Sequence, residues 1–120
     1  MTIAALLVAV AGCLFILFIG ARFLLAPKVA LAGFGVTEDR IRALTSIKGV
    51  RDITSGIVPL VVLLVGGPHV FGWALVTAAI TPIGDAIIVV TNGGSLRQAV
   101  SIHVVTAVIL IAAGLILALV

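Results

Sequence analysis

Three charged residues and one serine fall within a short apolar stretch of the sequence: Lys48, Arg51, Asp52 and Ser55. With ~100° of rotation per residue in a helix, these four side chains share one face about 100° wide. A charge near the centre of a bilayer costs from ~2.5 to more than 10 kcal/mol unless it is paired or faces a protected interior. We therefore interpret this face as part of a functional site on a membrane-crossing helix.

Two further polar sets occur later in the chain. Thr77, Thr81 and Asp85 are spaced i, i+4 and i+8, which places them along one side of a helix. His103 and Thr106 are spaced i, i+3 and share a face in the same way. We expect both sets to face the polar residues of the first stretch.

Two carboxylates, an arginine and a histidine in one low-dielectric site suit acid/base chemistry. One carboxylate can accept a proton while the other donates one at the same pH. Acyl transfer has little support, because the chain has no Tyr and no serine in a nucleophile elbow. A metal site is not expected because Arg51 lies beside the acids, and no glycine-rich phosphate loop predicts a nucleotide cofactor.

The elements that must position these residues are membrane spans. The chain has 120 residues, of which 63% are hydrophobic and 9% charged, whereas soluble domains have roughly 25% charged residues. This composition predicts an all-α, integral membrane four-helix bundle that forms a single domain over residues 1–120. The expected spans are residues 3–25, 43–65, 69–91 and 96–120.

Local signals set the ends of these spans. Pro27 stops the first helix, and the apolar connection over residues 28–36 is expected to lie at the membrane surface. Thr37 is a candidate cap for the second helix. Gly66-Gly67-Pro68 predicts a tight turn, and Ser95 a cap at the start of the last helix. A kink is expected at Pro59.

Basic residues predict the orientation of the bundle. Arginines and a lysine flank the first connection and one arginine follows the third, and we interpret them as topology residues: Arg22, Lys28, Arg40, Arg42 and Arg97. Connections one and three are therefore expected in the cytoplasm and both termini outside. The start lacks the basic region of a signal peptide, so the first span is expected to remain.

The net charge of +3 comes from basic residues beside membrane segments and does not indicate a nucleic-acid partner. The lone Cys13 excludes an intramolecular disulfide. We expect a multi-pass protein, in the bacterial inner membrane, whose partners are the bilayer and a lipophilic small molecule. Association of several copies stays open.

The polar residues of the three spans are expected at similar depths in the bilayer. At ~1.5 Å per residue, Arg51 and Asp52 lie ~12–14 Å from the cytoplasmic start of their span. Asp85 lies ~9 Å from the cytoplasmic end of its span, and His103 roughly 10 Å from the start of the last span. The sequence thus predicts one polar pocket in the cytoplasmic half of the bundle. The candidate catalytic residues are Asp52, Asp85, Arg51 and His103, and the candidate substrate-binding residues are Lys48, Ser55, Thr81 and Thr106.

Structural roles for these residues are the alternative. Lys48 can pair with Asp52 at i, i+4, or extend towards the headgroups. Arg51 can bridge to Asp85 without any catalytic purpose, and a neutral His103 can bond Thr81 or a carbonyl. The threonines can bond the carbonyls of their own helices.

The motifs Lys48-Gly49-Val50-Arg51-Asp52, Ser55-Gly56 and Gly84-Asp85, with the later His103, resemble a family of small four-span membrane proteins of bacteria and fungi that is described as a domain of unknown function. The outline is also similar to DoxX-type four-span proteins. Some fungal relatives are associated with polyketide tailoring and epoxide opening. The resemblance implies site roles for Arg51, Asp52, Asp85 and His103.

The implied activity has a chemical parallel. Soluble epoxide hydrolases of the limonene type use an Asp-Arg-Asp set, in which one Asp activates water and the other protonates the epoxide oxygen. Arg51, Asp52 and Asp85 offer the same groups. The leading hypothesis is therefore a membrane enzyme that opens lipophilic epoxides. A proton-linked transporter or channel using Asp85 and His103, and a structural subunit of a membrane complex, are the alternatives.

Overall fold

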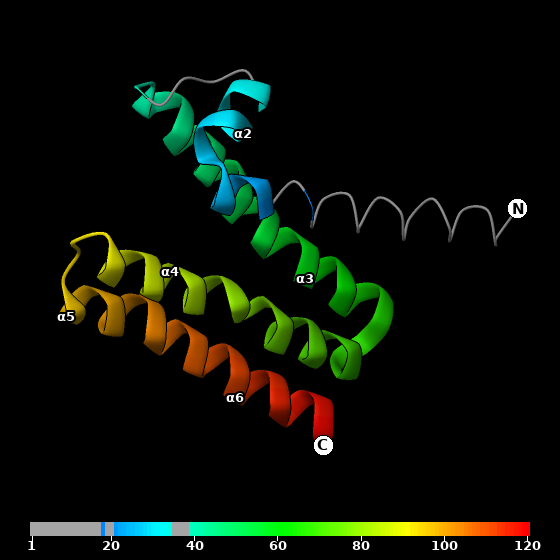
Figure 1. Cartoon of the computed structure of the whole chain (residues 1–120). Helices are drawn as coiled ribbons and strands as arrows, with labels where there is room; N and C mark the ends of the chain where they lie inside the picture. Colours follow the sequence, from blue (N-terminus) through cyan, green and yellow to red (C-terminus); the bar gives the residue numbers. More distant parts are fainter. Residues whose placement is uncertain (1–17, 19–20, 35–38) are drawn as a thin grey trace, which may run out of the picture. The chain divides into compact units, whose positions relative to one another are not determined.

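The computed structural model describes Phe18, residues 21–34 and residues 39–120 (Figure 1). The chain forms two compact units, Met1–Val50 and Arg51–Val120, and each is described by itself. Every regular element in the described residues is helical, as the sequence predicts: α2 (Pro27–Phe34), α3 (Ile41–Ala78), α4 (Ile80–Thr91), α5 (Leu96–Gln98), the π-helix η1 (Ala99–Val104) and α6 (Val105–Leu119). Most of the expected first span, and the expected Thr37 cap, lie outside the described residues.

In the first unit, the expected connection over residues 28–36 instead contains helix α2. Pro27 is the first residue of this helix, where its missing N–H breaks no hydrogen bond. The N–H of Ala26 donates to the carbonyl of Arg22 at 2.8 Å, and the N–H of Ala30 donates to the carbonyl of Ala26 at 2.9 Å. Pro27 therefore interrupts the helical path by one residue and then starts a new helix.

The predicted turn at Gly66-Gly67-Pro68 is present inside α3. Gly67 has φ 76° and ψ −179°, and it is the residue of α3 with non-helical dihedral angles. Pro68 disfavours helical geometry in the residue before it, and glycine alone adopts a positive φ at no steric cost. The dihedral angles at Pro59 are helical, and the break in helical geometry within α3 lies at Gly67. The kink expected at Pro59 stays a prediction.

A second break separates α3 from α4 at Ala79. It was not predicted from the sequence. Pro82 has no N–H to donate to the carbonyl of Ala78, four residues earlier. The N–H of Ala79 is shared between the carbonyls of Leu75 and Val76, at 3.2 and 3.3 Å. The loss of one helical hydrogen bond thus divides the expected third span into two helices.

The last helix begins with the predicted cap. The Ser95 hydroxyl accepts a hydrogen bond from the N–H of Gln98 at 3.1 Å. The next turns form η1, in which the N–H of Val105 reaches the carbonyl of Val100, five residues earlier. An i to i+5 turn holds one residue more than an α-turn, so the side chains of η1 rotate less per residue than those of α6. No pattern in the sequence predicted this change in helix type.

Gly67 divides α3 into two arms, and backbone atoms of the second arm, after Gly67, contact backbone atoms of α6. A Cβ atom on Gly72 would lie 2.6 Å from the carbonyl oxygen of Gly114 and 2.6 Å from the nitrogen of Ala118. A Cβ on Gly114 would lie 2.7 Å from the carbonyl oxygen of Gly72. Small residues permit such close helix approach. In the same unit, α4 contacts η1 and α6 and runs beside them (Figure 1).

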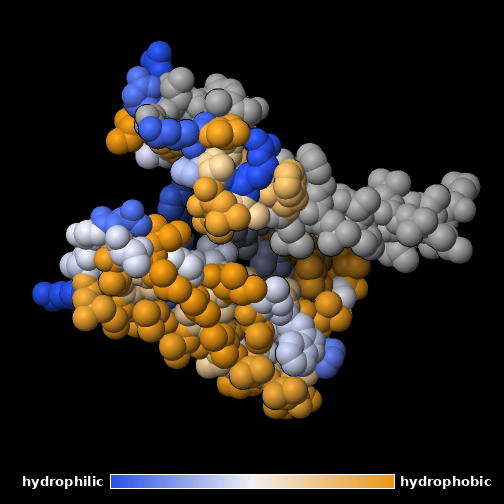
Figure 2. Space-filling view, in the orientation of Figure 1, coloured by the Kyte–Doolittle hydropathy of each residue, from blue (hydrophilic) through white to orange (hydrophobic). Residues whose placement is uncertain are grey.

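Two helical stretches, Ile41–Thr91 and Leu96–Leu119, are long and apolar enough to cross a membrane. Figure 2 shows apolar residues over most of the visible surface of α4 and α6, with hydrophilic residues gathered near α5. Large apolar side chains are exposed on both helices, including Ile87, Ile88, Val108 and Ile109. Such a surface is typical of helices that contact lipid.

Candidate functional site

A hollow of about 660 Å³ lies in the second unit, between the two arms of α3. Its walls come from the arm before Gly67, from the arm after it, and from the start of α4, with Leu110 of α6 as a further wall. The lining residues are Asp52, Thr54, Ser55, Val58, Pro59, Ala74, Leu75, Thr77, Ala78, Thr81, Pro82 and Leu110. Ligand sites in proteins have volumes of about 300–1,000 Å³ and are mostly apolar with a few polar groups. This hollow has the size and the composition of a small-molecule site.

The carboxylate in this lining comes from Asp52, on the first arm of α3. Three residues later in the same helix, Ser55 contributes its side chain to the same wall, as expected for an i, i+3 pair. Thr77 and Thr81 lie opposite, on the second arm of α3 and on α4. The turn at Gly67 is what brings these two polar sets, far apart in the sequence, to one hollow.

Two of the hydroxyl groups are bonded to their own helix. The Ser55 hydroxyl donates to the carbonyl of Arg51 at 2.8 Å, and the Thr77 hydroxyl donates to the carbonyl of Trp73 at 2.8 Å. The expected bonding of Thr77 to its own helix is therefore confirmed. The Thr81 hydroxyl has no hydrogen-bond partner among the described residues, so it remains able to donate to a ligand.

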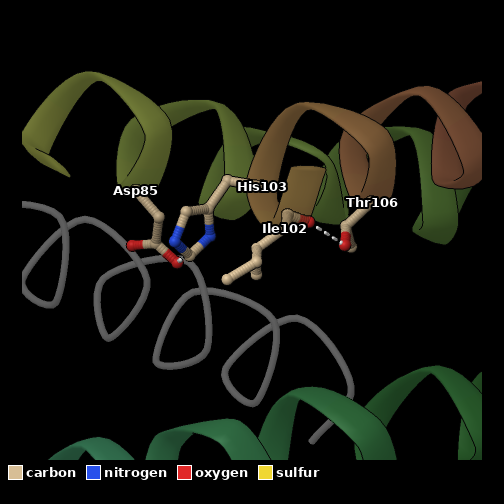
Figure 3. A network of polar contacts seen from close by, with 4 residues as sticks. All are labelled: Asp85, Ile102, His103 and Thr106. Carbon is tan, nitrogen blue, oxygen red and sulfur yellow. Dashed lines mark hydrogen bonds and ion pairs between the residues drawn. The ribbon is translucent and has the colours of Figure 1, made fainter. Parts of the chain in front are cut away.

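Asp85 and His103 form a second polar feature (Figure 3). Nδ1 of His103 lies 3.9 Å from Oδ2 of Asp85, and the two side chains are 24% and 36% exposed. This distance exceeds that of a hydrogen bond but permits an ion pair when the imidazole is protonated. The pair joins α4 to η1, because Asp85 belongs to the first and His103 to the second.

The two features are linked through α4. Asp85 follows Thr81 by four residues, so it lies on the same face of the helix, ~6 Å further along. Thr81 lines the hollow and Asp85 does not. The predicted polar stripe Thr77, Thr81 and Asp85 thus runs from the hollow to the ion pair. A proton or a water molecule would have to travel about one helical turn between them.

The other predicted site residues are not among the residues that line the hollow. Arg51 is exposed and does not line it, and among the described residues the ion-pair partner of Asp85 is His103, not Arg51. Thr106 donates its hydroxyl to the carbonyl of Ile102 at 2.5 Å, at the end of η1 (Figure 3). Lys48 belongs to the first unit.

Sequence reasoning missed the contribution of two prolines. Pro59 and Pro82 both line the hollow, and so do Ser55 and Ala78, which precede them by four residues. A signal was present: each proline falls inside an apolar helical segment, one turn from a predicted polar residue. Proline inside a helix exposes a carbonyl that has lost its donor, which is itself a polar feature.

The described residues contain no group of three His, Cys, Asp or Glu side chains placed to hold a metal ion. The region offers one carboxylate at the hollow, one carboxylate paired with an imidazole, and nearby hydroxyl groups. These groups can move protons and can bind a polar atom of an otherwise apolar ligand.

The fold and the site define an all-helical protein, with helices apolar and long enough to cross a membrane and an apolar hollow that has one carboxylate in its wall. The chain belongs to the family described as domain of unknown function DUF4267, whose family model matches residues 13–117. No curated protein and no solved structure matches the chain.

Proposed function

We propose that the chain is a multi-pass membrane enzyme that performs acid/base chemistry on a lipophilic small molecule, specifically the hydrolysis of an epoxide. The observation that carries this proposal is the hollow with Asp52 in its wall. Its apolar lining suits a hydrocarbon skeleton, and its carboxylate suits the activation of water. A substrate dissolved in the bilayer reaches such a site without entering water.

In the proposed reaction, the carboxylate of Asp52 takes a proton from a water molecule in the hollow. The oxygen of that water attacks one epoxide carbon, and the bond between this carbon and the ring oxygen breaks. The ring oxygen takes up a proton supplied through the Asp85–His103 pair, and the product is a vicinal diol. The proton on Asp52 then returns to the pair, so the net reaction adds one water to the epoxide.

Thr81 has a role that follows from its position. Its hydroxyl lines the hollow and lies one turn from Asp85 on α4. A hydroxyl at this place can donate to the epoxide oxygen and can pass a proton from the pair to it. Arg51 directly precedes Asp52 in α3 and brings a positive charge to the same segment.

The experiment uses the purified chain in lipid nanodiscs with a panel of lipophilic 1,2-epoxides, and measures diol formation. Asp52→Asn and Asp85→Asn are each expected to lower turnover at least about 10²-fold, the usual contribution of a general acid or base. Asp39→Asn is the matched control, because Asp39 lies in the first unit outside this site. Turnover by both site variants at the parent rate contradicts the assignment.

A proton-linked carrier is the second candidate, and the Asp85–His103 contact favours it. Carboxylate and histidine chains carry protons in membrane pumps and transporters. Proton flux into liposomes that contain the parent, and its loss in Asp85→Asn, would support this function over hydrolysis.

A further inference from the structure

Two backbone carbonyls in the wall of the hollow have lost their helical donors. The carbonyl of Ser55 would normally accept from the N–H of residue 59, and that of Ala78 from the N–H of residue 82. Both positions are proline, which has no N–H. All four of these residues line the hollow. Two prolines on different helices thus leave the carbonyls of two lining residues without their helical donors.

The side chains of the wall add further acceptors and few donors. The hydroxyl hydrogens of Ser55 and Thr77 are used within their own helices, so their oxygen lone pairs are what remains for a ligand. The Thr81 hydroxyl can donate one hydrogen bond, and the lining also includes Thr54, which has an interaction of its own. The wall is therefore apolar with an excess of hydrogen-bond acceptors.

An apolar site with an excess of acceptors favours a ligand that brings its own donors. Water in the hollow can satisfy the acceptors when no ligand is present, and a ligand without donors removes that water and leaves them unpaired. A lipophilic molecule with hydroxyl groups replaces the water's hydrogen bonds. An ether or an epoxide of the same skeleton has oxygen atoms that only accept.

We propose that this hollow recognises lipophilic alcohols, and vicinal diols above all, through the Ser55 and Ala78 carbonyls. The vicinal diol then binds more tightly than the epoxide from which it forms. Naming the diol as a product rests on the proposed function, but the preference for hydroxyl groups concerns binding alone. In an active enzyme the same preference produces inhibition by the product.

The test compares two probes that share one hydrocarbon chain: 1,2-decanediol, which donates, and 1,2-dimethoxydecane, which only accepts. Each is added at the same membrane concentration to the full chain in nanodiscs, and its affinity is obtained from the rise in Tm. The parent is expected to bind the diol roughly tenfold more tightly than the diether. Equal affinities for the two probes overturn the proposal without any variant.

Two variants assign the preference to the exposed carbonyls. Pro59→Ala and Pro82→Ala each restore an N–H that can donate to the carbonyl four residues earlier. Each is expected to weaken diol binding roughly three- to tenfold and to leave diether binding unchanged. Pro27→Ala is the matched control, because Pro27 is the first residue of α2, outside the hollow. Diol binding at the parent affinity in both hollow variants overturns the role of the carbonyls.

The result is separable from that of the epoxide assay. A chain that prefers the diol but hydrolyses no epoxide keeps this inference and loses the proposed function. A chain that hydrolyses epoxides but binds the diol and the diether equally keeps the function and loses this inference.

Discussion

His103 faces Asp85 across the contact between η1 and α4, with Nδ1 of the imidazole 3.9 Å from Oδ2 of the carboxylate. The two residues are eighteen positions apart in the sequence and come together because the chain reverses at residues 92–95. Gly93, with φ 85°, is the glycine that permits this reversal.

A double-mutant cycle measures this contact. Asp85→Asn and His103→Gln are each expected to lower the thermal stability of the chain in detergent, and the double variant to lose less than the sum. The expected coupling is about 0.5–1 kcal/mol, because both side chains are partly exposed. Asp85→Asn combined with His69→Gln is the control, and these two losses should add. Additivity in both pairs would mean that Asp85 and His103 do not interact.

The π-turn is expected to compensate for one extra residue next to His103. Deletion of the exposed Ser101 removes this residue from η1 and should convert it to α-helix. Because a π-turn and an α-turn complete about the same rotation with one residue of difference, the helix on either side should keep its orientation, and the coupling between Asp85 and His103 should persist. The measurement is the same cycle in the shortened chain, with circular dichroism to check helix content. Loss of the coupling would show that the π-turn does not compensate for the extra residue.

Close backbone approach makes Gly72 intolerant of any side chain. Gly72→Ala should lower the free energy of unfolding by about 1–3 kcal/mol, because the new Cβ would lie 2.6 Å from two backbone atoms of α6. Gly56→Ala is the matched control, since nothing lies within 4 Å of a Cβ there. That change should leave stability equal or raise it by up to ~1 kcal/mol. Similar Tm values for the two variants would contradict the packing of α3 on α6.

The turn at Gly67 has a separate requirement. With φ 76° and ψ −179°, this residue occupies a region that is essentially restricted to glycine. Gly67→Ala should therefore cost about 1–3 kcal/mol, although nothing lies within 4 Å of its Cβ. Gly49 also has nothing within 4 Å of an added Cβ, but its backbone is helical, so Gly49→Ala should not destabilise the chain. The comparison of their unfolding in detergent separates backbone strain from crowding.

The predicted orientation can be tested by cysteine labelling in a Cys13→Ser background. In intact bacterial cells, His69→Cys should react with a membrane-impermeant maleimide, because the second connection is expected outside. Asn92→Cys should react only after the inner membrane is permeabilised, because the third connection is expected in the cytoplasm. The reverse pattern would invert the topology, and labelling of both sites in intact cells would contradict the four-span arrangement.

The sequence by itself determined the helical fold of the described residues and the ends of several helices. The apolar composition predicts helices, because a helix satisfies the hydrogen bonds of its own backbone and can therefore be apolar throughout. The turn at Gly67 and the cap at Ser95 were also predictable, because a glycine before a proline and a serine before a helix act on their immediate neighbours.

The tertiary structure decided which polar residues meet. Helical spacing placed Thr77, Thr81 and Asp85 on one face, but only the fold puts Asp52 with Thr81 at the hollow and Asp85 with His103 beyond it. The number of residues from the end of a span predicts how deep a side chain lies in the bilayer. It does not predict the direction in which that side chain points around the helix axis. The π-turn changes that rotation before His103, and the prolines expose carbonyls that no side-chain pattern reveals. Rotation and backbone exposure depend on how the helices pack, which is why the single predicted pocket became two adjacent features.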